Sequence, residues 1–97
     1  MSDTSTKTTN LTTASFPRIL YRGLEGADVL LLQKYLTQDP TLLTATPNGY
    51  FGPSTEQAVK RFQVKYGLMS VKNPLTTGYG MFGKNTQAKF IQVFGGQ

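Results

Sequence analysis

The side chains that could do chemistry in this chain are few, and their types exclude most catalytic mechanisms. Cysteine and histidine are both absent from the 97 residues, which removes thiol nucleophiles, imidazole bases, disulfides and the usual zinc ligands. A hydrolase would then need paired carboxylates or a Ser/Lys or Thr arrangement. The acidic residues are Asp3, Glu25, Asp28, Asp39 and Glu56.

None of these carboxylates is placed as a catalytic acid by the sequence. Asp28 and Glu56 fall in the first turns of predicted helices, where a negative charge suits the helix dipole without any further role. Asp39 precedes a proline, and Asp3 lies in a polar N-terminal stretch. We therefore expect a domain that is not an enzyme and that needs no metal and no cofactor.

Aromatic and basic side chains are better candidates for ligand contact. Tyr50 and Tyr79 each lie beside a glycine turn, and a tyrosine ring offers a flat apolar face with a polar tip, which suits stacking on a ligand. Lys60, Arg61 and Lys65 form a dense basic cluster on the outward side of a predicted helix, where Arg61 could hold a carboxylate through two hydrogen bonds. The alternative for the two tyrosines is that they cover the end of a helix bundle. The alternative for the basic cluster is a solvated helix face.

A repeated motif sets the architecture that positions these residues. The pattern G-x-F-G-x-x-T occurs at 49–55 and again, 31 positions later, at 80–86. Its glycines permit backbone conformations that a side chain would oppose, and Phe51 and Phe82 are predicted core anchors. Thr55 and Thr86 fall in the first turn of the helix predicted after each motif, where we expect their hydroxyls to bond locally to the backbone. The repeat predicts two turn-then-helix units.

Three helices are predicted from hydrophobic spacing and from helix-end signals. The first is predicted over 27–36, with a buried stripe at i, i+3 and i+7, and ends before Asp39-Pro40. The second begins at Pro53 after Gly52 and stops at Gly67. The third runs from Lys84 or Asn85 to about Phe94. The predicted fold class is all-α, a compact three-helix bundle with glycine-rich turns and an internal turn-helix repeat.

Several packing roles are expected within this bundle. Gln33 and Gln63 each come directly after a core residue, and their amides can satisfy backbone groups that the glycine turns leave unpaired. Leu31 and Tyr35 form a second stripe on the first helix, favoured for packing over an exposed patch. The extended segment 16–21 is expected to add Ile19 and Leu20 to the core. The buried side of the third helix is expected to use Ala88, Phe90 or Ile91, and Phe94.

The first 15 residues differ in composition from the rest of the chain. Nine of them are Ser or Thr, and such a segment cannot bury enough apolar surface to offset the entropy lost on ordering. We expect residues 1–15 to be a flexible tail or linker and residues 16–97 to be one folded domain. The sequence contains no apolar run of about 18 residues, the length that would suggest a membrane span. No secretory signal is visible either.

Three glycine-anchored segments, taken in order, resemble the small peptidoglycan-binding domain found in many bacterial and phage wall hydrolases. The resemblance covers about residues 18–92. The matching segments read Gly23-x-x-Gly26-x-x-Val29-x-x-Leu32-Gln33-x-x-Leu36, then Gly49-x-Phe51-Gly52-Pro53-x-Thr55-x-x-Ala58-Val59-x-x-Phe62-Gln63-x-x-x-Gly67-Leu68, and then Gly80-x-x-Gly83-x-x-Thr86. Two segments depart from the family pattern, 39–48 by its length and 70–79 by replacing a short turn, and both would change the rim of any groove.

The resemblance implies a monomeric module that binds peptidoglycan, by its glycan or its peptide stem, and performs no chemistry itself. Such a module would anchor an attached protein to the wall, outside the cytoplasm, in the cell wall or periplasm or on a virion; anionic wall polymers are a further expected partner. Because the motif residues build the scaffold, ligand contacts are expected at the variable positions between them. The predicted ligand-binding residues are Tyr50, Gln57, Arg61, Lys65 and Tyr79.

Two other classes of function remain open at this point. The net charge of +5 favours polyanions in general, so a basic nucleic-acid-binding domain is one alternative. Its basic residues are spread thinly, however, and no Arg-rich recognition helix is visible. A homotypic interaction module that uses Leu31 and Tyr35 is the other alternative.

Overall fold

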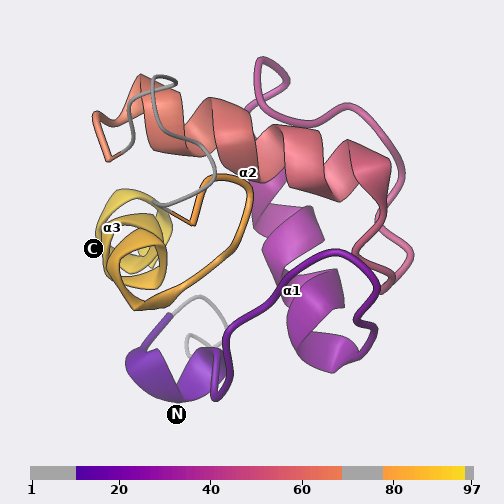
Figure 1. Ribbon diagram of the computed structural model, residues 1–97, viewed down its shortest axis with the longest axis horizontal. Helices are drawn as coiled ribbons and strands as arrows, with labels where there is room; N and C mark the ends of the chain where they lie inside the picture. Colours follow the sequence, from indigo (N-terminus) through magenta and orange to yellow (C-terminus); the bar gives the residue numbers. More distant parts are fainter. Residues whose placement is uncertain (1–10, 69–77, 96–97) are drawn as a thin grey trace, which may run out of the picture.

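The computed structural model describes residues 11–68 and 78–95, which form three α-helices and one short 3₁₀ helix (Figure 1). The 3₁₀ helix η2 spans Thr13–Ser15, and the α-helices are α1 (Ala27–Leu36), α2 (Pro53–Lys65) and α3 (Lys84–Gly95). Within these residues the chain forms no strand beyond two isolated antiparallel bridges. The predicted all-α, three-helix fold is confirmed.

The helix ends agree with the glycine and proline signals in the sequence. α2 has Pro53 as its first residue and Gly52 as its extended N-cap, as predicted. Gly67, just past the end of α2, has a φ of 72°, the left-handed conformation that terminates helices. Before α1, Gly26 has a φ of 150°, a backbone conformation that residues with a Cβ rarely adopt.

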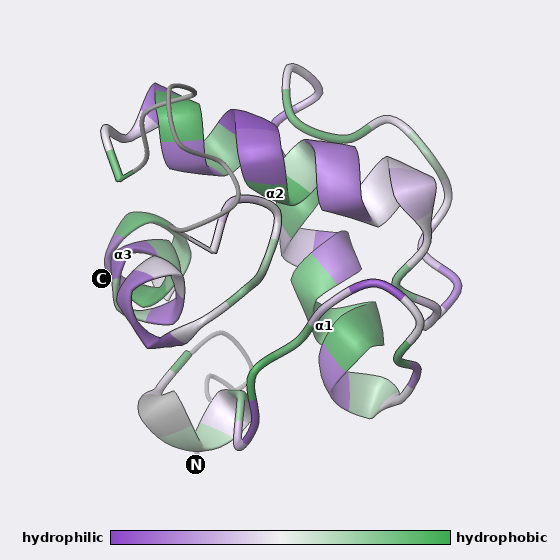
Figure 2. Cartoon of the chain, in the orientation of Figure 1, coloured by the Kyte–Doolittle hydropathy of each residue, from purple (hydrophilic) through white to green (hydrophobic). Residues whose placement is uncertain are grey.

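The core lies where the three helices meet, and aromatic rings fill much of it. Figure 2 shows apolar residues over much of α1, whereas α2 carries hydrophilic residues on its outer face. Phe51 and Phe82, the predicted anchors, are fully buried. Phe90 of α3 is also fully buried and contacts five other rings, those of Phe16, Tyr35, Phe62, Phe82 and Phe94.

Two buried glutamines hold the two repeated turns. The Gln33 amide group donates to the Tyr50 carbonyl and the Thr55 hydroxyl, and its oxygen accepts from the backbone N–H groups of Asn48 and Gly49. These contacts confirm the predicted structural role of Gln33. They also correct the prediction for Thr55, whose hydroxyl bonds across the bundle to a glutamine and not to its own helix start.

Gln63 repeats this arrangement around the second turn. Its amide group donates to the Gly78 and Met81 carbonyls and to the Thr86 hydroxyl, and its oxygen accepts from the Gly80 N–H. Gln63 is completely buried. The correction for Thr55 therefore applies equally to Thr86, and the internal repeat extends from sequence to hydrogen bonding.

The segment 20–26 connects the two repeats by backbone pairing. At one end, Leu20 exchanges both backbone hydrogen bonds with Phe82, at 3.2 and 2.8 Å. At the other end, Phe51 accepts from Gly23 and donates to Leu24, both at 2.8 Å. One extended segment thus fixes the position of both turns, and with them the starts of α2 and α3.

The N-terminal boundary of the packed chain lies earlier than expected. Leu11 is buried, and it occupies the space beside Gly95, where an added Cβ would lie 2.7 Å from that of Leu11. The expected start at Phe16 is therefore too late, because η2 and Leu11 pack with the domain. Residues 1–10 of the expected tail, and residues 96–97 at the other end, lie outside the described residues.

Two side chains expected in the core are exposed. Ile19 is 42% exposed, because it alternates with the buried Leu20 along an extended segment. Ala88 is also exposed, whereas Phe90 is buried and Ile91 and Phe94 are half-buried. Leu31 and Tyr35 pack against the core, as the favoured interpretation of that stripe predicted.

Candidate functional site

The outer face of α2 presents four side chains that take no part in the core: Gln57, Lys60, Arg61 and Val64. They lie opposite the buried stripe of α2, as the helical spacing predicted. Of the predicted binding residues, Gln57 and Arg61 lie on this face. Lys65, one turn further on, is exposed as well.

A segment between α1 and α2, residues 39–46, runs beside this face, and we call it the strap. Two buried leucines, Leu42 and Leu43, hold it to the core. Arg61 Nη1 donates to the Leu42 carbonyl at 3.1 Å, and the Lys65 ammonium forms an ion pair with Asp39. The strap makes up most of the segment 39–48, which departs in length from the family pattern, and it forms one wall beside α2.

Three hollows lie in a row between the strap and α2 and together form what we call the α2 groove. The first, of about 430 Å³, is lined by Thr41, Leu42, Gln57, Lys60, Arg61, Val64, Lys65 and Tyr79. The second, of about 340 Å³, shares Gln57 and Arg61 with the first. The third, of about 140 Å³, shares Leu43, Ala45, Pro53 and Ser54 with the second and includes Tyr50.

The structure places all five predicted binding residues along this groove. Gln57, Arg61, Lys65 and Tyr79 line the first hollow, and Tyr50, which is 45% exposed, lines the third. Tyr50 and Tyr79 therefore do not form one shared platform, because they line different hollows.

Lys60 is a groove residue that the predicted set omitted. Its Nζ lies 5.1 Å from the centre of the Tyr79 ring, a cation–π contact that positions both side chains. The basic cluster in the sequence contained Lys60, but helical spacing alone did not show that Tyr79, from a different segment, would lie beside it.

The cations of the groove differ in how freely they can meet a ligand. Lys65 is engaged with Asp39 and lies 3.5 Å from the Thr41 hydroxyl. Arg61 uses one N–H on the strap, and its remaining donors have no partner among the described residues. Arg61 and Lys60 thus offer positive charge to the groove, which no acidic side chain lines within the described part of the chain.

The ion pair between Asp39 and Lys65 shifts the pKa of the Asp39 carboxyl, and this shift can be measured. Hydrogen bonds from the Lys65 ammonium and then from Thr41 lower the pKa of Asp39 from 3.8 to about 2. Because the pKa is lower in the folded state, the pair stabilises the fold above pH 3.8, and this contribution is lost as the pH falls through about 2.

Replacement of Lys65 tests this ion pair directly. In Lys65→Met we expect the pKa of Asp39, followed by NMR of its carboxyl carbon, to rise toward 3.8 because its main hydrogen-bond donor is gone. Lys89→Met, which removes a lysine on α3, should leave the Asp39 titration unchanged. An Asp39 pKa that stays near 2 in Lys65→Met would contradict the pairing.

The remaining described carboxylates are mostly engaged in ion pairs. Asp28 binds Arg18, with Nε and Oδ2 2.9 Å apart, and this hydrogen bond lowers the pKa of Asp28. Glu56 lies 3.5 Å from Arg22. No group of three or more potential metal ligands occurs in residues 11–68 and 78–95. None of the helices in these ranges has the length and apolar character to span a membrane.

The small all-α domain presents an open cationic groove along α2, a shape that could hold a ligand. Residues 25–70 match the family described as "Putative peptidoglycan binding domain". The match confirms the resemblance predicted from the three segments, although it ends before the second repeat. It favours wall binding over the nucleic-acid and homotypic alternatives.

A solved structure has a similar fold. The chain is similar to the crystal structure of the SleB N-terminal domain, with 28% identity and a TM-score of 0.66. The similarity covers 79% of this chain and 93% of that one. A comparison with curated proteins finds no match.

Proposed function

We propose that this domain binds peptidoglycan through the α2 groove and anchors an attached protein to the cell wall, outside the cytoplasm. The family match supports the ligand class. The observation that carries the proposal is the row of connected hollows, lined by two tyrosines and two available cations. It is an extended, open surface, suited to a polymer and not to an enclosed small molecule.

The charge of the groove favours the peptide stem over the glycan as the main contact. Lys60 and Arg61 face the first hollow, and no acidic side chain of the described residues lines the groove to balance them. A stem carboxylate would accept from the free donors of Arg61, while Tyr79 and Val64 offer apolar surface to stem side chains. Anionic wall polymers would meet the same cations.

The described carboxylates support a noncatalytic role. Asp28 and Asp39 have lowered pKa values because each accepts hydrogen bonds from a cation. A general acid at neutral pH needs the opposite, a raised pKa. Glu56 is held near Arg22, and none of these three acids lines the α2 groove. The domain is therefore proposed to bind the wall and leave chemistry to whatever it is attached to.

Charge removal in the groove tests the proposed function. In Lys60→Gln and Arg61→Gln we expect binding to purified sacculi to weaken about tenfold each, because one charge-assisted hydrogen bond is lost. Lys34→Gln, an exposed lysine on α1 outside the groove, is the charge-matched control and should bind as the unaltered domain does. The measurement is a sedimentation assay with insoluble sacculi at fixed ionic strength.

Two versions of the sacculi separate the possible ligands. Sacculi stripped of anionic polymers should retain the domain if the stem is the contact. Loss of binding on stripping would identify the polymers as the ligand. Equal binding by all three variants would refute the α2 groove as the site, and no retention of the unaltered domain would refute the proposed function itself.

A further inference from the structure

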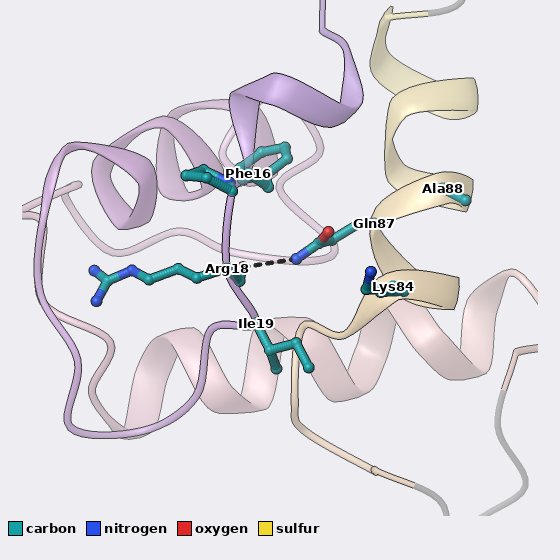
Figure 3. Close-up of a pocket in the computed structure, with 7 residues that line it drawn as sticks. Phe16, Arg18, Ile19, Lys84, Gln87 and Ala88 are labelled. Atoms are coloured by element: carbon teal, nitrogen blue, oxygen red, sulfur yellow. Dashed lines mark hydrogen bonds between the residues drawn. The ribbon is translucent and has the colours of Figure 1, made fainter.

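A second hollow lies between the segment 16–19 and the first half of α3 (Figure 3) and shares no lining residue with the α2 groove. Its volume is about 260 Å³, slightly below the roughly 300–1,000 Å³ of pockets that enclose whole small molecules. It is lined by Phe16, Pro17, Arg18, Ile19, Lys84, Gln87 and Ala88. The size suits one chemical group of a larger molecule.

The most informative residue of this hollow is Gln87, which is only 8% exposed. Its Nε2 donates to the Arg18 carbonyl at 2.9 Å and to the Phe82 carbonyl at 3.0 Å (Figure 3 shows the first). Both partners are acceptors, so the orientation of the amide is fixed and its oxygen cannot exchange places with its nitrogen. The Gln87 Oε1 accepts from no donor among the described residues.

A buried amide oxygen without a donor is costly, because it has lost its hydration without gaining a hydrogen bond. Here the oxygen belongs to a side chain that lines the hollow. Gln33 and Gln63, the other two buried glutamines of the described ranges, use both ends of their amides on the protein itself. Gln87 differs from them in leaving one acceptor for a group that enters from outside.

The neighbours of Gln87 define what that group would be. Lys84 and Ala88 lie three positions before and one after Gln87, so Lys84 shares one face of α3 with both. Lys84 is exposed and forms no ion pair within the described residues. The Arg18 guanidinium points away from the hollow, toward Asp28, while Phe16 and Pro17 add apolar surface.

We propose that this hollow is a second binding site, for a secondary amide that carries a methyl group. The amide N–H would donate to Gln87 Oε1, the amide carbonyl would accept from the Lys84 ammonium, and the methyl would pack on Phe16 and Ala88. Two components of peptidoglycan carry such a group, the acetamido substituent of the sugars and the alanyl peptide bonds of the stem. The site is separate from the α2 groove and does not depend on it.

An NMR titration of the whole domain with two soluble probes tests this site and identifies the source of the amide. The probes are di-N-acetylchitobiose and alanyl-alanine amide, and de-N-acetylated chitobiose is the matched negative ligand. We expect one probe, or both, to shift the Gln87 side-chain amide signals and the backbone signals of residues 84–88. A shift with the sugar alone assigns the acetamido group, and a shift with the peptide alone assigns the stem.

Variants of the hollow supply the control. Lys84→Gln should weaken the responding probe about fivefold, and Ala88→Phe should abolish its effect by filling the hollow. Lys89→Gln, on the same helix but outside the hollow, should change nothing. If neither probe moves the Gln87 signals, or de-N-acetylated chitobiose moves them as strongly, the proposal is wrong.

This outcome is distinguishable from failure of the proposed function. If sacculi retain the domain but neither probe shifts the Gln87 amide signals, only the second site is refuted. Gln87 signals that respond while sacculi are not retained would refute wall binding and leave the amide site standing.

Discussion

The Gln63→Leu variant should lose about 3–5 kcal/mol of its free energy of unfolding, although leucine nearly matches glutamine in size. Gln63 makes four hydrogen bonds in a completely buried position. Leucine would leave the Met81 carbonyl and the Gly80 N–H without their partner, whereas the Gly78 carbonyl keeps the Met81 N–H, and each unsatisfied buried group costs about 1–3 kcal/mol. A typical small domain has a free energy of unfolding of about 5–15 kcal/mol in total. A loss of this size should therefore bring the variant close to unfolding.

Urea denaturation monitored by circular dichroism measures this loss. Gln92→Leu is the matched control, because Gln92 is exposed on α3, and it should change stability by less than about 0.5 kcal/mol. Gln33→Leu should behave like Gln63→Leu, since Gln33 holds the first turn in the same way. A cost below about 1 kcal/mol for both buried glutamines would show that the turns do not depend on them.

The Phe90→Ala variant should lose a similar amount, about 3–5 kcal/mol, for a different physical reason. Phe90 is fully buried and contacts five other rings, so its removal leaves a cavity that the surrounding side chains fill only in part. For a domain of this size we expect the melting temperature to fall by at least about 12 °C.

Phe94→Ala provides the comparison for Phe90→Ala on the same helix. Phe94 is half-buried and packs at the edge of the core, so its truncation should cost clearly less. Thermal unfolding of the two variants under identical conditions decides the point. Equal losses would mean that the aromatic cluster is not centred on Phe90.

Local signals in the sequence predicted the scaffold well. Pro53 after Gly52, and Gly67 beyond the end of α2, mark helix ends because proline and glycine restrict or free the backbone at single positions. The roles of Gln33 and Gln63 could also be predicted from position, since each lies at the edge of a buried stripe. Helix ends and buried stripes depend on neighbours in the sequence and could therefore be predicted, whereas the partners of Gln33 and Gln63 lie 15 to 23 positions away.

Contacts between distant segments were less predictable. Lys65 pairs with Asp39, 26 positions away, and nothing local in either segment indicates that pairing. The exposure of Ile19 depends on a backbone bridge formed by its neighbour Leu20. Each of these contacts requires the packing of whole elements.

The candidate site shows the same division. Helical spacing placed Gln57 and Arg61 on the outer face of α2, but it could not show that the strap would turn this face into a groove. Gln87 gave no sequence signal at all, because a glutamine on a short helix is more often solvated. Its burial and its single free oxygen become visible only when Arg18 and Phe82 are seen beside it.

The contact between Leu11 and Gly95 has a consequence for how the domain sits within a longer polypeptide. Because Leu11 packs directly against Gly95, a chain passing through the domain would enter and leave at nearly the same point. The domain would then add almost nothing to the reach of the segments on either side. The domain would project to one side of the flanking segments. Its orientation at a surface would then be set by the ligand that it binds and not by the direction of the chain.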